Sequence, residues 1–154
     1  RASRGSGVHP YAVYIGGALA CLICAYMLGG LRGAVVYLCL CGYAQSQLLM
    51  SDYVQHYGLR RRTLETGRLE PVGPHHSWNA PHVFSARMVF NAPVHSDHHT
   101  HPTRPFPALI LPGQEMAPTL PQSLPAMSVL ALFPKLWRRV MDPRAQDWQQ
   151  RGAG

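Results

Sequence analysis

Residues 11–31 read YAVYIGGALACLICAYMLGGL and contain no charged side chain, and after Arg32 the sequence is again uncharged from Gly33 to Ser51. Each run has about 20 residues, which as a helix span about 30 Å, the hydrocarbon thickness of a bilayer. The runs predict two transmembrane helices, at about 11–31 and 33–57, joined by a tight turn. A secretory signal peptide followed by one buried helix is the alternative, but the first run is too long for the apolar core of a signal peptide.

The net charge of +7 comes from arginines that lie beside the apolar runs, although only 14% of the residues are charged. A separate basic face is lacking, so the charge does not indicate nucleic-acid binding. The two ends of a helical hairpin lie on one side of the membrane, and by the positive-inside rule the arginine-rich side is cytoplasmic. We therefore predict a multi-pass protein of the inner membrane, with everything after Tyr57 on the cytoplasmic side. The arginines near the two ends are Arg1, Arg4, Arg60, Arg61, Arg62 and Arg68.

Prolines divide the chain after the apolar runs. Residues 67–82 predict an irregular connection, and residues 105–125, with six prolines, predict an extended segment. Short helices are expected before Pro93 and up to His101, because a proline cannot continue a preceding helix. Residues 127–139 predict a helix that lies at the membrane interface, since aromatic and basic side chains follow an apolar stretch.

These observations together predict an all-α membrane protein. A two-helix transmembrane hairpin (residues 1–58) is followed by a cytoplasmic, helical, Pro-rich metal-binding cap (residues 59–146). The last residues, 147–154, are expected to form a disordered tail.

The stretch HSDHHTH, residues 95–101, carries four histidines in seven positions. On a helix, His95, His98 and His99 lie on one face, and His101 lies off it. Three convergent imidazoles without a cysteine favour iron, zinc or copper over calcium or magnesium, which prefer oxygen ligands. A histidine-rich surface turn is the alternative, so the metal site is a hypothesis at this stage.

Other polar residues are open to more than one interpretation. His56, in the stretch DYVQHYG, follows the second apolar run and is either a further ligand or an interfacial partner of the helix C-terminus. Asp97 either orients an imidazole by accepting its second N–H or is an exposed carboxylate. His75, His76 and His82 are ligands, supporting groups or neither.

Four motifs occur in order between Asp52 and Arg144: DYVQHYGLRR, GRLEPVGPHHSWNAPH, FNAPVHSDHHTHPTR and FPKLWRRVMDPR. Together they resemble the C-terminal part of the integral-membrane alkane monooxygenases, which are alkane hydroxylases of the fatty-acid-desaturase-like superfamily. The resemblance implies an enzyme with two non-haem iron ions. Such an enzyme uses dioxygen and two electrons from a rubredoxin-type donor to hydroxylate the terminal methyl group of an alkane.

The resemblance also assigns roles to residues. The family's H-S-D-H-H box falls on His95, His98 and His99, and the histidine of its H-Y-G motif falls on His56, which implies that these four are iron ligands. The chain departs from the family at Val94, where arginine is usual, and at Asp52 and Gln55, where asparagine and glutamate are usual. Gln55 removes a carboxylate near a proposed ligand, which changes the charge around the metal. The residues expected to support the site are Asp52, Gln55, His76, Trp78, Asn79, His82 and Asp97.

Two further histidine boxes of the family, of the H-E-x-x-H and E-H-x-x-x-H-H kinds, do not occur in these residues. The expectation is therefore a C-terminal portion of the enzyme that is inactive by itself. One alternative is a related membrane hydroxylase or desaturase that acts on a fatty-acyl chain or an aromatic methyl group. Another is a non-catalytic, degenerate membrane fragment. A soluble zinc hydrolase fits less well, because no carboxylate beside the cluster is an obvious general base.

Overall fold

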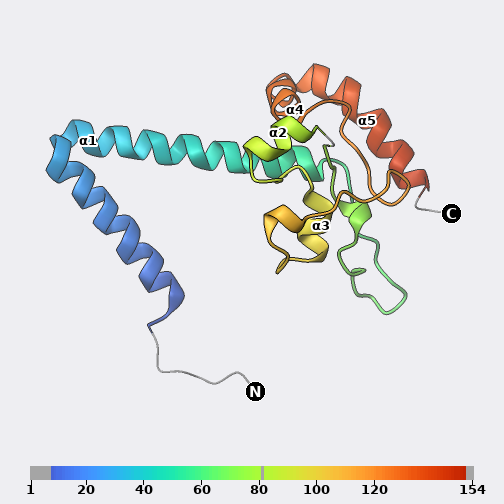
Figure 1. The fold of residues 1–154 in the computed structure, drawn as a ribbon, viewed down its shortest axis with the longest axis horizontal. Helices are drawn as coiled ribbons and strands as arrows, with labels where there is room; N and C mark the ends of the chain where they lie inside the picture. The colour runs from blue at the N-terminus through green and yellow to red at the C-terminus, as the bar shows by residue number, and fades with distance from the viewer. Residues whose placement is uncertain (1–7, 81, 152–154) are drawn as a thin grey trace. The chain divides into compact units, whose positions relative to one another are not determined.

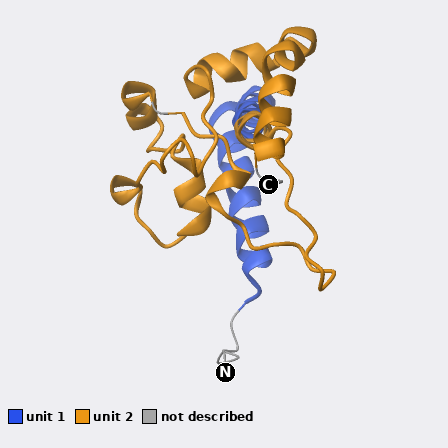
Figure 2. Cartoon of the chain, turned by 90° about the vertical axis from the view of Figure 1, so that its right-hand side faces the viewer, with its two compact units in different colours: residues 1–47 blue, residues 48–154 orange. Residues whose placement is uncertain are grey.

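The computed structural model describes residues 8–80 and 82–151 of the chain. Within these residues it contains helices and two isolated β-bridges but no β-strand, so the all-α prediction is confirmed. The chain divides into two compact units, unit 1 (Arg1–Gln47) and unit 2 (Leu48–Gly154), which Figure 2 shows in different colours. The helices in Figure 1 are α1 (Pro10–His56), α2 (Val83–Met88), α3 (His95–Thr100), α4 (Leu124–Ala131) and α5 (Pro134–Arg151), with 3₁₀ turns η1 (Pro74–His76) and η2 (Phe106–Ala108).

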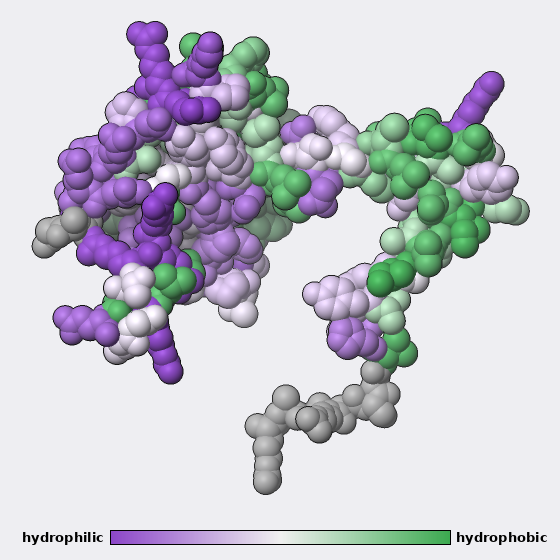
Figure 3. All heavy atoms as spheres, turned by 180° about the vertical axis from the view of Figure 1, so that it is seen from behind, coloured by the Kyte–Doolittle hydropathy of each residue, from purple (hydrophilic) through white to green (hydrophobic). Residues whose placement is uncertain are grey.

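Helix α1 is 47 residues long, and its length and composition are sufficient to cross a membrane. The face drawn in Figure 3 is largely hydrophobic along this helix. The backbone leaves helical values at Gly30, where φ is 59° and ψ is −150°, and the chain changes direction there (Figure 1). Glycine adopts this left-handed φ without the penalty that a Cβ atom imposes. The two predicted spans thus lie in one helical element that is interrupted at Gly30.

Unit 2 has a hydrophobic core built from segments far apart in the sequence. Val54, from the last turns of α1, lies in the same cluster as Trp78 from the following loop and Trp137 from α5. The indole N–H of Trp78 donates to the Tyr57 carbonyl at 2.8 Å, and the Trp78 backbone N–H donates to the Gln55 carbonyl at 2.7 Å. The loop that contains Trp78 is therefore fixed against the end of α1. The cluster comprises Val54, Trp78, Ala80, Leu120, Leu124, Met127, Trp137, Met141 and Ala145.

Gly58 ends α1 with a left-handed backbone, at a φ of 71°. A Cβ atom at this position would lie 2.6 Å from the Cβ atom of Ala145, which belongs to the core of unit 2. Gly58→Ala is therefore expected to destabilise unit 2 by about 1–3 kcal/mol, through backbone strain and a clash with α5. The measurement is the urea midpoint of the full chain in detergent micelles, followed by tryptophan fluorescence.

Gly67→Ala is the matched control, because Gly67 also has a positive φ, of 73°, but a Cβ atom there meets nothing within 4 Å. Equal losses in the two variants would show that the contact with Ala145 contributes nothing.

Helix α5 continues to Arg151, into the segment that the sequence analysis expected to form a disordered tail. Two contacts account for the extension. Arg151 forms an ion pair with Asp147 one turn earlier, at 2.8 Å, and the Trp148 indole N–H donates to the His75 carbonyl at 3.1 Å. The ion pair is local, but the contact of Trp148 does not follow from the local composition, because His75 lies 73 residues away. The rest of the predicted tail, residues 152–154, and the predicted cytoplasmic arginines Arg1 and Arg4 lie outside the described residues.

Candidate metal centre

Three of the histidines singled out in the sequence converge in unit 2. His56 is the last residue of α1, and His95 and His99 lie one turn apart on α3. The Nε2 atom of His95 lies 3.1 Å from Nε2 of His56 and 2.9 Å from Nε2 of His99. One ligand atom from each of the three lies within 4.8 Å of the others.

The spacing of these nitrogens suits a metal ion. Two imidazole nitrogens bound to one ion at about 2.1 Å are roughly 3 to 3.4 Å apart, depending on the coordination angle. The His95 distances of 2.9 and 3.1 Å are close to this range. A donor set made only of imidazole nitrogens selects iron, zinc or copper rather than calcium or magnesium. The residues present therefore fit the iron that the sequence resemblance implies.

His98 is separate from this trio. Its ring centroid lies 6.3 Å from that of His95 and 5.7 Å from that of His99, and its side chain is exposed. The six residues of α3 thus present two of their three histidines to His56. His101 hydrogen-bonds to Asp97 and is not part of the trio.

The ring of His56 is oriented by the backbone of η1. Its Nδ1 atom lies 3.1 Å from the carbonyl oxygen of His76, and because a carbonyl only accepts, Nδ1 carries the proton. The lone pair of a neutral His56 is then on Nε2, which faces His95. A carboxylate oxygen of Asp52 lies 3.6 Å from the same Nε2 atom. A ligand histidine with its second nitrogen held by a carbonyl is the usual arrangement around protein-bound metals.

His76 is itself held by Glu70, a residue that sequence reasoning missed. Nδ1 of His76 accepts the Gly73 N–H at 2.9 Å, so Nε2 carries the proton and donates to a Glu70 carboxylate oxygen at 2.9 Å. The same oxygen accepts the Arg62 backbone N–H at 2.7 Å. These contacts, the Arg62 N–H first and His76 second, lower the pKa of Glu70 to about 2. Glu70 thereby fixes the loop whose carbonyl orients His56.

Glu70, His75 and His76 also lie close enough to share an ion. Both nitrogens of His76 are already used in hydrogen bonds, however, and the Nε2 proton points at Glu70. This group is therefore a hydrogen-bonded support of the loop. No sequence spacing signals it, because Glu70 and His76 are brought together by the turns at Pro71, Gly73 and Pro74.

A buried network anchors the start of α3, which at six residues is too short to be stable alone. The amide oxygen of Asn79 accepts the Ser96 backbone N–H at 3.0 Å, and its nitrogen donates to the Ser96 hydroxyl at 2.6 Å. The one proton of that hydroxyl is shared between the carbonyl oxygens of Pro74 and Ser77, at 2.7 and 3.0 Å. Asn79, Ser77 and Ser96 are at most 1% exposed. The network fixes α3, and with it His95 and His99, to the loop that follows α1.

Asp97 is a further buried residue of α3. The Arg104 guanidinium donates to both of its carboxylate oxygens, at 2.7 and 2.6 Å, and the Ile110 N–H donates at 2.9 Å. Burial raises the pKa of Asp97, but the hydrogen bonds from Ile110, Arg104 and His101 outweigh it and leave the pKa below its ordinary value. Asp97 therefore holds the segment after α3 in place, and the imidazole it contacts is that of His101.

The remaining supporting residues from the sequence analysis differ in their surroundings. Gln55 is buried, accepts the Ser51 hydroxyl at 2.8 Å and donates to the Ala92 carbonyl at 2.9 Å. It thus joins the end of α1 to the segment that leads into α3. His82 is exposed at the start of α2, and within the described residues its ring makes no hydrogen bond. The structure does not bring His82 to the histidine trio.

Burial first, and then the charges of His99, His56 and His98, lower the pKa of His95 to about 3. Burial, followed by the charges of His56 and His98, also lowers the pKa of His99. A neutral imidazole offers a lone pair, so His95 is ready to bind a metal without losing a proton at neutral pH.

These shifts predict that acid destabilises metal-free unit 2. Below the ordinary pKa of 6.5 an unfolded His95 takes up a proton, whereas folded His95 does not until about pH 3. Glu70 acts in the same direction at lower pH, because its stabilisation is present above 4.5 and is lost as pH falls through about 2. The urea midpoint of the full chain in micelles should therefore fall steadily between pH 6.5 and 3. A midpoint that is constant from pH 7 to 4 would contradict this.

The amino-acid sequence of the chain is similar to sequences of known proteins. A family model described as fatty acid desaturase matches residues 4–131. An alkane 1-monooxygenase of Ectopseudomonas oleovorans is 45% identical over 103 residues, which are 66% of this chain and 25% of that protein. An alkane 1-monooxygenase 2 of Alcanivorax borkumensis is 39% identical over 124 residues, 80% of this chain and 32% of the relative. The hydroxylase component of a xylene/toluene monooxygenase of Pseudomonas putida is 35% identical over 103 residues, 66% of this chain and 26% of the relative. The chain thus spans a quarter to a third of the length of these curated relatives.

Proposed function

Since the chain belongs to the fatty acid desaturase family, we propose that it contributes part of the iron site of a membrane monooxygenase that hydroxylates the terminal methyl group of alkanes. The observation that carries the proposal is the convergence of the His56, His95 and His99 nitrogens. The second support is the identity of up to 45% with proteins named alkane 1-monooxygenase. Both supports lie in the part of the chain that holds the histidines.

The proposed metal content is two non-haem iron ions. His56, His95 and His99 supply one group of ligands, and His98, which lies outside this group, supplies a ligand to the second ion. A complete site needs further ligands, which the longer relatives have room to provide, so this chain by itself is proposed to be inactive. When bound, iron supplies the redox chemistry that activates dioxygen.

The residues of the chain then have defined tasks. His76 orients His56 through its carbonyl, Asn79 fixes α3, and Gln55 ties α1 to the approach to α3. An alkane offers no polar handle, so its binding depends on an apolar surface near the site. The electrons are proposed to come from a rubredoxin-type protein that docks on the same side as unit 2.

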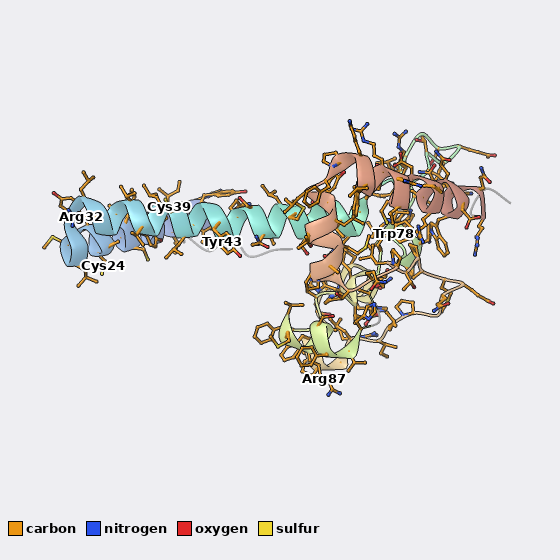
Figure 4. The ribbon with its side chains drawn as sticks, turned by 90° about the horizontal axis from the view of Figure 1, so that it is seen from above. Cys24, Arg32, Cys39, Tyr43, Trp78 and Arg87 are labelled. Carbon is orange, nitrogen blue, oxygen red and sulfur yellow. The ribbon has the colours of Figure 1, made fainter. Side chains whose placement is uncertain are left out.

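We further propose that α1 crosses the inner membrane twice, as a hairpin that turns near Gly30. Residues 1–58 form this membrane part, and residues 59–146 form a cytoplasmic cap that holds the iron and rests on the membrane interface. Support comes from Gly33, where an added Cβ atom would collide with the Ala25 carbonyl, which indicates a tight bend. Arg32, labelled in Figure 4, is the one Arg, Lys, Asp or Glu between Tyr11 and Ser51.

The function is tested by exchanging the matching 103 residues of the Ectopseudomonas oleovorans relative for those of this chain. The chimera is expressed in cells that also make a rubredoxin-type donor, and the products from octane, xylene and a fatty acid are analysed. The expected product is the terminal alcohol of octane. A folded, iron-loaded chimera that oxidises none of the three would contradict the proposal.

A second candidate is hydroxylation of an aromatic methyl group, which the 35% identity with the xylene/toluene monooxygenase component favours. Its lower identity places it behind the alkane reaction. In the same experiment, a benzylic alcohol from xylene with no octanol would favour this second candidate.

A further inference from the structure

A basic pocket lies in unit 2, next to the end of α1 and apart from the histidine trio. It has a volume of about 910 Å³. Three consecutive arginines, Arg60, Arg61 and Arg62, line one part of it, and Trp148 and Arg151 from the last turns of α5 line another. The pocket contains none of the three converging histidines. Glu70 and Pro74 line it and also support the iron site, but none of the proposed iron ligands lies in it.

The positive charge of this pocket is not neutralised by its acidic residues. The Glu70 carboxylate is directed at the Arg62 backbone N–H and at His76, so it is occupied within its own loop. The Arg61 guanidinium donates to the backbone carbonyl of Glu70, which places Arg61 without cancelling its charge. Arg60 and the Arg62 guanidinium make no ion pair with any residue that the structure describes. The pocket therefore keeps an excess of guanidinium groups even when Glu115, which also lines it, is counted.

The chemistry of these side chains suits a phosphate group. A guanidinium presents a planar set of donors that matches phosphate oxygens in pairs. Trp148 adds an amphipathic ring of the kind enriched at membrane interfaces, and its indole N–H is fixed on the His75 carbonyl. A pocket of about 910 Å³ is also within the usual range for sites that hold a small organic ligand.

The arginines lie shortly after α1, and this position favours a membrane lipid as the molecule that carries the phosphate. Arg60 follows the last residue of α1 so closely that it lies within roughly 15 Å of the end of that helix. Clusters of basic residues directly after a membrane helix bind anionic lipid headgroups. We propose that this pocket binds the phosphate of an anionic phospholipid. The inference rests on the membrane placement proposed above and is independent of the iron chemistry.

The test uses the full chain in zwitterionic detergent micelles, titrated with short-chain phosphatidylglycerol and followed by tryptophan fluorescence. Saturable binding is expected, together with no effect of inorganic phosphate at the same concentration. The variant Arg60→Gln/Arg62→Gln should bind at least 20-fold more weakly, because each arginine near an anionic lipid contributes about fivefold. Arg61 is left unchanged because it holds the Glu70 loop.

The matched control is Arg87→Gln/Arg144→Gln, which removes the same charge outside the pocket. Arg87 extends outward from α2 (Figure 4). This control should bind the lipid within about twofold of the wild type. A second variant, Arg60→Lys/Arg62→Lys, keeps the charge but loses the planar donors, so it should show an intermediate loss.

Four results would overturn the inference: no saturable lipid binding, equal losses in the pocket variant and the control, equal binding of inorganic phosphate, or binding at these arginines of an acidic electron-transfer protein instead of lipid. Insertion of the chain into phosphatidylcholine nanodiscs is measured separately. Failure to insert would overturn the membrane placement and the inference together, whereas insertion without binding of phosphatidylglycerol would overturn the inference alone. Iron binding by the histidines is unaffected in either case.

Discussion

His95→Ala is expected to weaken metal binding by at least about 100-fold. His95 is the central member of the trio, because its Nε2 atom lies within 3.1 Å of both other Nε2 atoms. Removing it leaves two nitrogens that lack a common neighbour, and loss of even a supporting residue costs 10–100-fold in metal affinity. Co(II) is a suitable probe, because its visible absorption reports nitrogen ligation in the full chain held in nanodiscs.

The matched control for this variant is His82→Ala, since His82 is exposed and stands outside the trio. Its Co(II) affinity should stay within about twofold of the wild type. A second control, His98→Ala, should leave the binding of the ion at the trio intact, because His98 lies outside the trio. Equal losses in His95→Ala and His82→Ala would show that the histidines bind metal as an unstructured cluster.

Trp137→Ala is expected to unfold most of unit 2. The Trp137 side chain is fully buried and packs against Tyr53 of α1 and against Tyr57, the residue after that helix, with ring centroids 5.6 and 5.1 Å away. Truncating a buried tryptophan costs about 3–5 kcal/mol, a large fraction of the 5–15 kcal/mol that stabilises a typical domain. His56, His95 and His99 should then no longer lie close together, because the end of α1 that carries His56 packs in the same core as Trp137.

The measurement for Trp137→Ala is urea unfolding of the full chain in micelles, followed by circular dichroism. Leu136→Ala is the control from the neighbouring position, where the side chain is 51% exposed and the expected change is within 0.5 kcal/mol. An unchanged urea midpoint in Trp137→Ala would mean that α5 does not pack on α1 as the structure shows.

The histidine trio could be anticipated because helical periodicity is local. His95 and His99 are four residues apart, so one face of a helix presents both, and the apolar runs likewise identify α1 by composition alone. The assignment of His56 as a metal ligand needed the family resemblance, since a single histidine at a helix end has several explanations. The geometry then shows that all three nitrogens face one another.

Other features depend on contacts between distant segments and had no local signal. Glu70 supports His76 because the intervening loop turns back on itself. Asp97 was open to two interpretations, a carboxylate that orients an imidazole or an exposed one, but Arg104 and the Ile110 N–H bind its oxygens once the chain after α3 folds over it. Helix α5 extends past the point where its polar sequence suggested fraying, because Trp148 reaches back to the His75 carbonyl. In each case the observed structure depends on tertiary contacts, which local sequence propensity does not determine.

The central claim is that the nitrogens of His56, His95 and His99 bind iron together. Its most direct test is X-ray absorption at the iron edge of the full chain, loaded with Fe(II) in nanodiscs. The account predicts a coordination shell with the multiple-scattering signature of several imidazoles, which decreases in His95→Ala and is unchanged in His82→Ala. An oxygen-only shell, or a spectrum that is the same in all three proteins, would contradict it.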